Sequence, residues 1–402
     1  MQPAGGYHGG KAKVHKKVAA APPDDGGWPT YGFDAARTRY APFKLHPPFR
    51  QVWQRFIGGQ IEFPPVAVDG RLYIAQLQGN FVTLDGDTGK TLWRRRFVGR
   101  CSAASPTVVD GVIYQAYLPA PCAYGPRGVP SFVAAMDADT GRILWRFPTG
   151  PTESSTLVVN GVLYFGDWDG YVYAVDLRTH KLRWRYAVDG EIDSSPAYAG
   201  GTIYIGTNGG SVYALNARTG GLRWRFSGGG EYFYATPSVA YGRVFIGNTS
   251  GSLYALNATT GAELWRQYVG TYVYTSAAVW RGRVYVGSYD GTFAAYNART
   301  GDPIWRFSAS AAIHGAPAVM DGLVYFSTCS LCGARGSRGS KQGPRNTYAL
   351  EAQTGRVVWV WDGIGTYSPL VADRNHVYLV GRAQVFGLEP KRVTQRSRTA
   401  SR

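Results

Sequence analysis

Ionisable and aromatic side chains recur at one position of a repeated unit in this 402-residue chain. Each copy contains a glycine that is followed three residues later by an aromatic residue, and the position lies eight residues before that glycine. In the last copy Arg374 replaces the glycine. In chain order it holds Glu62, Ala103, Glu153, Asp193, Tyr234, Tyr274, His314 and Thr366. Three of the first four residues are acids and three of the last four have aromatic rings, and Glu191, Tyr232 and Tyr367 lie in the same segments.

If these positions meet at one end of a channel, carboxylates on one side face aromatic rings on the other. Such a pocket suits a cationic or peptide group, a sugar, or a metal with a ligand. Three converging carboxylates would suit Ca²⁺. A solvated rim of ordinary loop residues is the alternative, and we assign neither catalytic residues nor a metal ligand set.

Three of the four cysteines fall in two insertions that we expect on the same face, and Cys101 lies in a linker that we expect there too. Cys101 and Cys122 would form a disulfide that staples an insertion at residues 118–130. Cys329 and Cys332 would form a local disulfide in a second insertion at residues 328–346. Free thiols are the alternative for both pairs. A zinc or redox site at Cys329 and Cys332 is the less favoured hypothesis, because structural zinc needs four ligands and the chain has no second pair of this spacing.

The elements that must position these residues belong to a repeat of roughly 40 residues. In seven copies a threonine precedes a tryptophan by five residues, and an eighth tryptophan, Trp53, stands near the start without that threonine. The seven tryptophans are Trp93, Trp145, Trp184, Trp224, Trp265, Trp305 and Trp359. A repeat of this length is typical of propeller blades.

Short alternating strands separated by glycine turns indicate four antiparallel strands in each repeat. Eight inner hairpins indicate eight blades. The last blade has no tryptophan strand of its own, so we expect residues 52–56 to supply it and close the ring, which removes the open sheet edges. The sequence therefore predicts an all-β, eight-bladed β-propeller over residues 28–390, with disordered basic tails at 1–27 and 391–402.

The unit Ala-x-Asp-x-x-Thr-Gly-x-x-x-Trp, complete at Ala135–Trp145, resembles the tryptophan-docking motif of the pyrroloquinoline-quinone (PQQ)-like propeller repeat. The resemblance extends over residues 28–390 and includes the opening Trp28–Tyr40 segment. It implies that the eight tryptophans are structural. Asn, Glu, His180 and Thr83 replace motif residues in some copies, which are changes that a packing motif tolerates.

The resemblance implies two classes of function. Quinoprotein dehydrogenases hold PQQ and Ca²⁺ in the channel and carry a disulfide between adjacent cysteines over the cofactor. Non-catalytic relatives include the lipoprotein of the outer-membrane β-barrel assembly machinery. Because no two cysteines of this chain are adjacent, we expect a non-enzymatic scaffold that binds a protein or peptide through the channel mouth and the two insertions. A PQQ- and Ca²⁺-dependent dehydrogenase and a carbohydrate-binding propeller are the alternatives.

The net charge of +17 is concentrated outside the predicted blades. Thirteen basic residues and no acid lie in residues 11–17, 333–346 and 391–402. Tails of this kind suit an anionic membrane or wall surface better than nucleic acid, whose binding proteins carry basic residues on a folded face. The cysteines favour an extracytoplasmic location, with a signal or anchor missing from this chain, and a cytoplasmic relative is the alternative. We expect a monomer.

Overall fold

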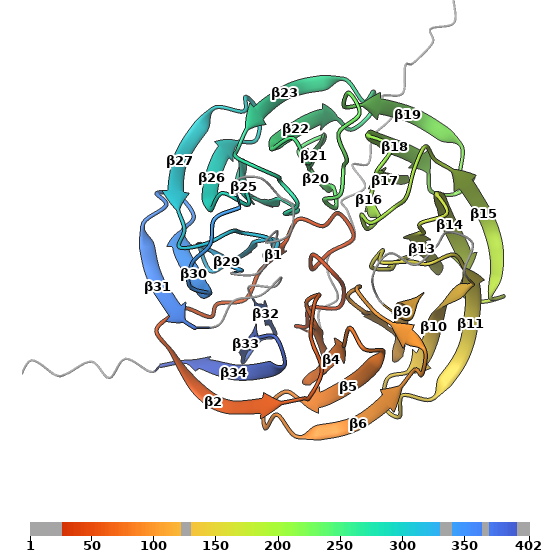
Figure 1. Ribbon diagram of the computed structural model, residues 1–402, viewed down its shortest axis with the longest axis horizontal. Coiled ribbons are helices and arrows are strands. Elements are labelled where there is room, and N and C mark those ends of the chain that lie inside the picture. Colours follow the sequence, from red (N-terminus) through yellow and green to blue (C-terminus); the bar gives the residue numbers. More distant parts are fainter. Residues whose placement is uncertain (1–25, 122–129, 330–339, 364–369, 392–402) are drawn as a thin grey trace, which may run out of the picture.

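The computed structural model describes residues 26–121, 130–329, 340–363 and 370–391. They form eight β-sheets arranged as blades around a central channel, so the predicted eight-bladed propeller is confirmed (Figure 1). Within the described ranges the chain has strands and turns but no helix, and therefore none that could cross a membrane.

Each blade runs from an innermost strand at the channel to an outermost strand at the rim. Blade 1 contains β3 (Val66–Val68), β4 (Arg71–Ala75), β5 (Asn80–Asp85) and β6 (Thr91–Arg96). Blade 2 contains β8 (Thr107–Val109), β9 (Val112–Pro119), β10 (Ser131–Asp137) and β11 (Ile143–Thr149), with β7 (Arg100–Cys101) paired to β9. Blade 3 contains β12 (Leu157–Val159), β13 (Val162–Gly166), β14 (Tyr171–Asp176) and β15 (Lys181–Ala187). Blade 4 contains β16 (Ala197–Ala199), β17 (Thr202–Gly206), β18 (Ser211–Asn216) and β19 (Leu222–Ser227).

The remaining blades repeat this order. Blade 5 contains β20 (Ser238–Ala240), β21 (Arg243–Gly247), β22 (Ser252–Asn257) and β23 (Glu263–Tyr268). Blade 6 contains β24 (Ala278–Trp280), β25 (Arg283–Gly287), β26 (Thr292–Asn297) and β27 (Pro303–Ser308). Blade 7 contains β28 (Ala318–Met320), β29 (Leu323–Ser327), β30 (Asn346–Glu351) and β31 (Val357–Asp362), and β1 (Tyr40–Ala41) pairs with β28. Blade 8 contains β32 (Val371–Ala372), β33 (Val377–Val380), β34 (Gln384–Pro390) and, as its outermost strand, β2 (Phe49–Phe56).

Burial along the strands follows their place in the blade. The second strand of blade 3, β13, is buried at every residue because neighbouring blades cover both of its faces. The outermost strand β11 alternates between half-buried and exposed residues over most of its length. This difference explains why the inner strands are continuously apolar and the outer ones alternate with arginine.

The repeat tryptophans join neighbouring blades. Trp224 lies in β19, the outermost strand of blade 4. Its Nε1–H donates a hydrogen bond to the carbonyl of Ala258 in blade 5 at 3.0 Å. A Cβ on Gly261, which has a φ of +76°, would lie 2.7 Å from the indole of Trp224. The glycine of the motif therefore provides both the turn and the space for the ring. Trp145 instead stacks on His180, which replaces that glycine, with ring centroids 4.7 Å apart.

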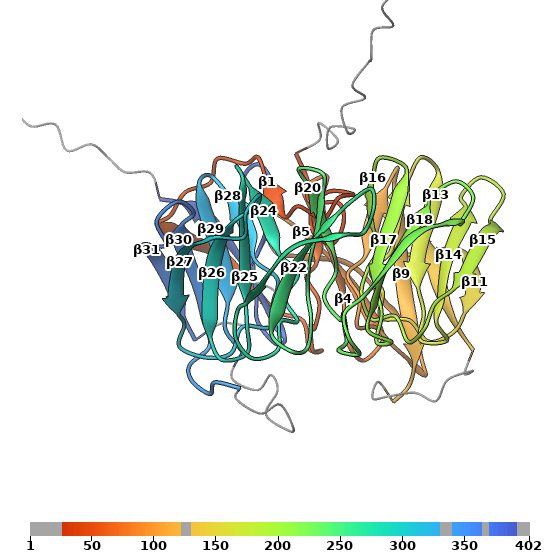
Figure 2. The same ribbon diagram turned by 90° about the horizontal axis from the view of Figure 1, so that it is seen from above.

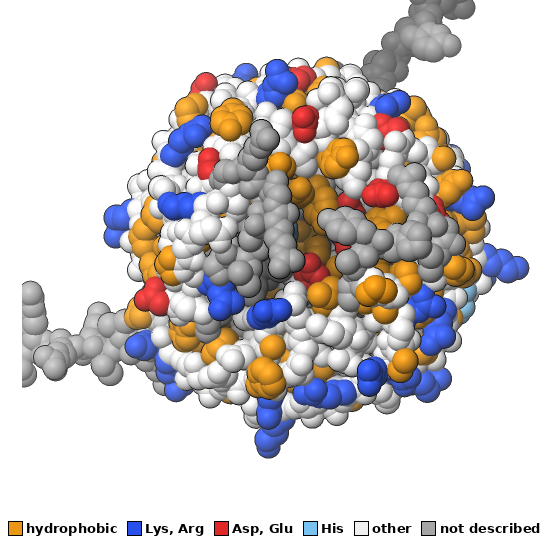
Figure 3. Space-filling model, in the orientation of Figure 1, with side chains coloured by type: hydrophobic (Ala, Val, Ile, Leu, Met, Phe, Trp, Pro, Cys, Tyr) orange, Lys and Arg blue, Asp and Glu red, His pale blue; other side chains and the backbone are white. Residues whose placement is uncertain are grey.

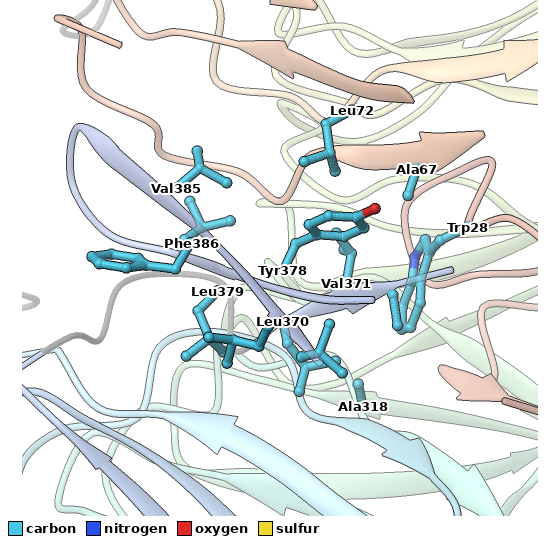
Figure 4. Close-up of a cluster of buried hydrophobic side chains, with 14 of the residues drawn as sticks. Trp28, Ala67, Leu72, Ala318, Leu370, Val371, Tyr378, Leu379, Val385 and Phe386 are labelled. Carbon is cyan, nitrogen blue, oxygen red and sulfur yellow. The ribbon is translucent and has the colours of Figure 1, made fainter. Parts of the chain in front are cut away.

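The ring closes through the two ends of the propeller. Strand β2 pairs antiparallel with β34, with Phe49 opposite Pro390 and Phe56 opposite Gln384. Figure 4 shows the apolar cluster at this closure, which includes Trp28 and Leu72 from the start of the propeller and Tyr378 and Phe386 from its end. The prediction that residues 52–56 complete the last blade is therefore correct.

The segment before β2 was not predicted to have a place in the channel. Residues 28–41 cross one end of it, opposite the face of the blade-connecting loops (Figure 2). Their backbone carbonyls accept hydrogen bonds from the innermost strands of several blades, among them Val108 in blade 2 and Val319 in blade 7. Blades 4, 5 and 6 contribute Tyr198, Val239 and Val279 in the same way. The segment thus fastens the inner strands together and covers that end of the channel.

Candidate site at the channel mouth

The loops from each outermost strand to the next innermost strand open on one face, which we call the mouth face. Figure 3 views this face and shows hydrophobic side chains in the central hollow with acidic side chains beside it. The described residues at the predicted ring position form what we call the mouth ring: Glu62, Glu153, Asp193, Tyr234, Tyr274 and His314. All six are half-buried, whereas Ala103 is fully buried. Thr366 and Tyr367 lie outside the described residues.

Asp193 of the mouth ring accepts two side-chain hydrogen bonds. Its carboxylate accepts a hydrogen bond from Nε1 of Trp168 at 2.6 Å and from Nδ2 of Asn208 at 2.5 Å. Glu153 accepts a hydrogen bond from the Tyr234 hydroxyl at 3.2 Å. This bond joins blade 3 to blade 5, so the acidic and aromatic halves of the mouth ring are in direct contact.

Aromatic rings form the other half of the site around Tyr274. This ring packs edge-on against Tyr234 with centroids 4.8 Å apart and lies parallel to Tyr272 at 5.8 Å. Tyr289 and His314 cover it at 5.0 and 5.9 Å. The Tyr289 hydroxyl is hydrogen-bonded to Nδ1 of His314. The rings therefore form one continuous aromatic wall.

Burial shifts the pKa values of the three acids, of Tyr234 and of His314 in this ring towards their neutral forms. It raises the pKa of Glu62 to about 7 and that of Asp193 to about 6. Burial, followed by the charges of Asp193 and Glu62, holds the pKa of Glu153 well above its ordinary value. Burial lowers the pKa of His314 to about 3. At neutral pH the ring therefore carries negative charge on Asp193 and a neutral imidazole at His314.

Tyr31 from the N-terminal segment forms the inner end of this site. It lies against Phe63, with ring centroids 6.1 Å apart, and its hydroxyl is 3.5 Å from Oγ of Ser276. The cavity that it lines with Asp193, Tyr234 and other ring residues has a volume of about 30 Å³. A space of this size holds one or two water molecules.

Two further sets of residues were missed by the sequence analysis. The mouth ring is extended by residues two positions before a turn glycine, namely Trp168, Asn208 and Tyr289. The second set lies two residues after the ring position. In four blades the hydroxyl at this place accepts a hydrogen bond from the backbone N–H of the equivalent residue in the preceding blade, at 2.9 to 3.0 Å. These acceptors are Ser155, Ser195, Thr236 and Ser276. The same repeat offset would have revealed both sets, whereas Tyr31 lies outside the repeats.

The structure provides no metal-binding arrangement in the part of the chain that it describes: no three His, Cys, Asp or Glu side chains there are placed to hold an ion. The carboxylates of the mouth ring hence do not converge as a Ca²⁺ site requires. Cys101 and Cys329 are both disulfide-bonded. Cys122 and Cys332 lie outside the described residues, so the two proposed pairings stay predictions.

A larger groove, of about 680 Å³, lies away from the mouth ring. It is bounded by residues 40–46 of the N-terminal segment, by Trp280 and Arg281, and by the 351–358 turn of blade 7. Its charges are mixed, and Glu351 is already paired with Arg356. We therefore place the candidate site at the mouth ring, where polar and aromatic groups converge.

Comparison with known proteins gives one family. A family model described as outer membrane protein assembly factor BamB matches residues 50–191, 130–272 and 249–401. A curated relative of that name from Burkholderia pseudomallei is 31% identical over 140 residues, which are 34% of this chain and 33% of the relative. The match thus spans about a third of that relative's length.

Solved structures share the fold. BamB from Moraxella catarrhalis has a TM-score of 0.66 at 18% identity, covering 87% of this chain and 99% of that structure. The quinohemoprotein alcohol dehydrogenase ADHIIG from Pseudomonas putida HK5 has a TM-score of 0.72 at 15% identity, and the match covers 94% of this chain and 82% of that structure. At these identities the structures establish the propeller alone. The family match extends over nearly all of the blades, and the chain belongs to the PQQ-like propeller family described as outer membrane protein assembly factor BamB.

Proposed function

We propose that this propeller is a non-enzymatic scaffold that binds a protein or peptide partner at its mouth face, outside the cytoplasm. The family match over residues 50–401 is the observation that carries the proposal. The curated relative is named as a factor in outer membrane protein assembly, which supports a protein as the partner and an extracytoplasmic location.

The chemistry of the mouth ring supports a cationic group of the partner as the anchor. The pKa of Asp193 is about 6, so its carboxylate is mostly ionised at neutral pH, and Tyr274 lines the same cavity. A carboxylate together with aromatic faces attracts a lysine or arginine side chain. We expect that side chain to displace the water that the small cavity can hold.

The small cavity also supports a scaffold over a quinoprotein dehydrogenase. Sites for small molecules have volumes of about 300 to 1,000 Å³, whereas the hollow lined by the described mouth residues and Tyr31 measures about 30 Å³. A saturable rise in thermal stability that needs both PQQ and Ca²⁺ would instead favour the dehydrogenase.

Two tyrosines of blade 5 provide a matched test of the binding face. Tyr232 lies in the loop before β20 on the mouth face, and Tyr241 lies in the hairpin after β20 on the opposite face. They are 51% and 53% exposed. A photo-crosslinking amino acid at position 232 should capture a protein partner in the cells that make the chain, and one at position 241 should not.

A third variant ties that capture to the mouth ring. Adding Asp193→Asn to the position 232 variant should reduce crosslinking about tenfold, because one charge-assisted contact contributes on the order of 1.4 kcal/mol. Equal crosslinking from positions 232 and 241 would contradict the proposed face. If crosslinking from position 232 does not change with Asp193→Asn, the proposal that a cationic group of the partner binds at Asp193 would be contradicted.

A further inference from the structure

Four arginines line one cleft between the hairpins of blades 5 and 6, on the face opposite the mouth face. This arginine cleft has a volume of about 520 Å³. The described residues that line it include Arg243, Arg281, Arg283 and Arg299, and no acidic residue. Its volume lies within the range of about 300 to 1,000 Å³ that small-molecule sites have. Because a cleft lined by charges of one sign focuses the electrostatic potential, it attracts ligands of the opposite sign.

The described part of the chain gives these four guanidinium groups no carboxylate partner. None of them belongs to an ion pair between described residues. Arg243 donates instead to two backbone carbonyls, at 2.9 and 3.4 Å, and Arg281 lies over the ring of Trp280, 4.7 Å from the centroid. Asp321 lines the neighbouring larger groove together with Arg281, but the two are not paired. The positive charges of the arginine cleft are therefore left for a ligand to neutralise.

Blades 1 and 2 show how the same pair of positions is neutralised elsewhere in the ring. Arg71 follows the hairpin glycine of blade 1, and it forms an ion pair with Asp139 in the turn between the third and fourth strands of blade 2. Arg243 is the equivalent residue of blade 5, and Arg299 occupies the place of Asp139 in the turn of blade 6. The fold thus accepts an acid at this place in one interface and has an arginine there in the other.

Tyr241 provides a fixed wall of the arginine cleft. Its hydroxyl accepts a hydrogen bond from the backbone N–H of Gly282 at 2.9 Å, which ties the hairpin of blade 5 to that of blade 6. The Tyr241 residue is nevertheless 53% exposed, and Ile304 in the same lining is 39% exposed. Arg281 and Arg299 are exposed as well. A ligand in the cleft therefore meets carbon surface beside accessible guanidinium groups.

We propose that the arginine cleft binds a diphosphate group, carried either by a soluble molecule or by a lipid whose headgroup is a diphosphate. The planar guanidinium matches the geometry of phosphate oxygens and binds them with paired hydrogen bonds. Four guanidinium groups in one cleft favour the ligand that concentrates the most negative charge in the least volume. Two linked phosphates do so, whereas an acidic peptide carries a single charge on each residue. The bound group contacts the hairpins of both blades and offsets the repulsion among the arginines.

Isothermal titration calorimetry of the full chain with inorganic pyrophosphate, at constant ionic strength, tests the site. We expect one saturable site, with inorganic phosphate at least about tenfold weaker because it reaches fewer guanidinium groups. Arg299→Asp should weaken pyrophosphate binding on the order of a hundredfold, since it removes one contact and gives Arg243 the kind of partner that Arg71 has. Its thermal midpoint should stay within about 2 °C of the wild type, because an exposed ion pair changes stability little.

Arg218→Asp is the matched control. Arg218 holds the same place as Arg299 in the turn of blade 4, and in both turns the backbone N–H of the arginine donates to an asparagine, at 2.9 and 2.8 Å. The residue of blade 3 equivalent to Arg243 is Val162, so this turn has no facing arginine. The control makes the same change of charge and should bind pyrophosphate like the wild type.

Flotation with phosphatidylcholine vesicles that contain a polyprenyl diphosphate distinguishes the two sources of the diphosphate. Loss of flotation in Arg299→Asp but not in Arg218→Asp would support the lipid. Equal flotation of both variants, with pyrophosphate binding lost only in Arg299→Asp, would support the soluble ligand. The absence of saturable pyrophosphate binding to the wild type would overturn the proposal. Equal weakening of pyrophosphate binding by both variants would mean attraction to surface charge in general, and would overturn it too.

Discussion

Glu62 is the acid of the mouth ring whose pKa shift has burial as its only cause. Burial is the cause that raises its pKa to about 7. Glu153 lies near enough for the Glu62 charge to raise its pKa further. The ring therefore gains negative charge between pH 6 and 8, when Asp193 and then Glu62 ionise.

This shift predicts a pH-dependent gain in stability for Glu62→Gln. Between pH 4.5 and 7 the folded protein binds more protons at this carboxyl than the unfolded chain, so ionisation of Glu62 destabilises the fold as the pH rises through 7. At pH 8 we expect the variant to be more stable than the wild type by about 2 kcal/mol. At pH 4 to 5 the difference should vanish. Denaturant unfolding at each pH measures it.

Glu263→Gln is the control for that measurement. Glu263 lies exposed on the outermost strand of blade 5, so its removal should change stability by no more than about 0.5 kcal/mol at any pH. A difference for Glu62→Gln that stays constant from pH 4.5 to 8 would show that packing, and not ionisation, is responsible.

At the scale of the blade, the contact between a tryptophan and the glycine of the next blade joins the repeats. Gly261 and Gly242 both belong to blade 5 turns and both have positive φ, +76° and +68°. A Cβ on Gly261 would meet the indole of Trp224 at 2.7 Å, whereas one on Gly242 would have nothing within 4 Å. The two glycines differ in this contact while sharing their backbone conformation.

Gly242→Ala should accordingly cost about 1 kcal/mol, from the backbone alone. Gly261→Ala should cost a further 1 to 3 kcal/mol, because the indole must move. In a Trp224→Ala background the extra cost of Gly261→Ala should disappear, which is a coupling that a double-mutant cycle measures. Equal costs for the two glycines in the wild type would mean that the tryptophan contact does not determine the choice of glycine.

The elements that the sequence predicted are those that repeat. Seven threonine–tryptophan pairs and eight inner hairpins, seven of which contain the glycine, indicated the blades, and the unpaired strand around Trp53 indicated the closure. Alignment of the repeats also identified the position that became the mouth ring. Residues 28–41 occur once and have no periodicity, so their course across the channel depends on tertiary contacts, such as Arg37 with Thr156, that no local pattern encodes.

The sequence likewise could not predict how closely the side chains of the mouth ring approach one another. Repeat position placed Glu62, Glu153 and Asp193 at the same end of the channel, but their separation depends on side-chain direction and on partners such as Trp168. Trp168 and Asn208 each donate a hydrogen bond to one of the two oxygens of Asp193. The aromatic half was easier to anticipate, because large rings at neighbouring positions of a narrow channel must touch.

At the scale of the whole molecule, the propeller depends on one pairing between the two ends of the chain. Strand β2 occupies the outer edge of blade 8 and pairs with β34 over nearly its whole length. Trp53 donates its Nε1–H to the carbonyl of Gly86 in blade 1 at 2.8 Å. The pairing therefore connects blade 8 to blade 1 as well as completing blade 8.

Deleting residues 49–56 should open the ring. Strand β34 would become an unpaired edge beside the apolar residues of the closure, and such an edge pairs with other chains. We expect dimers or larger species by size-exclusion chromatography with light scattering, together with a lowered thermal midpoint. Arg50→Ala, which removes only an exposed ion pair with Glu389, should stay monomeric and lose at most about 1 kcal/mol. A synthetic peptide of residues 49–56 added in trans should restore the monomer by adding the missing strand to β34. A monomeric deletion variant with an unchanged thermal midpoint would mean that the other blade contacts hold the ring closed without β2.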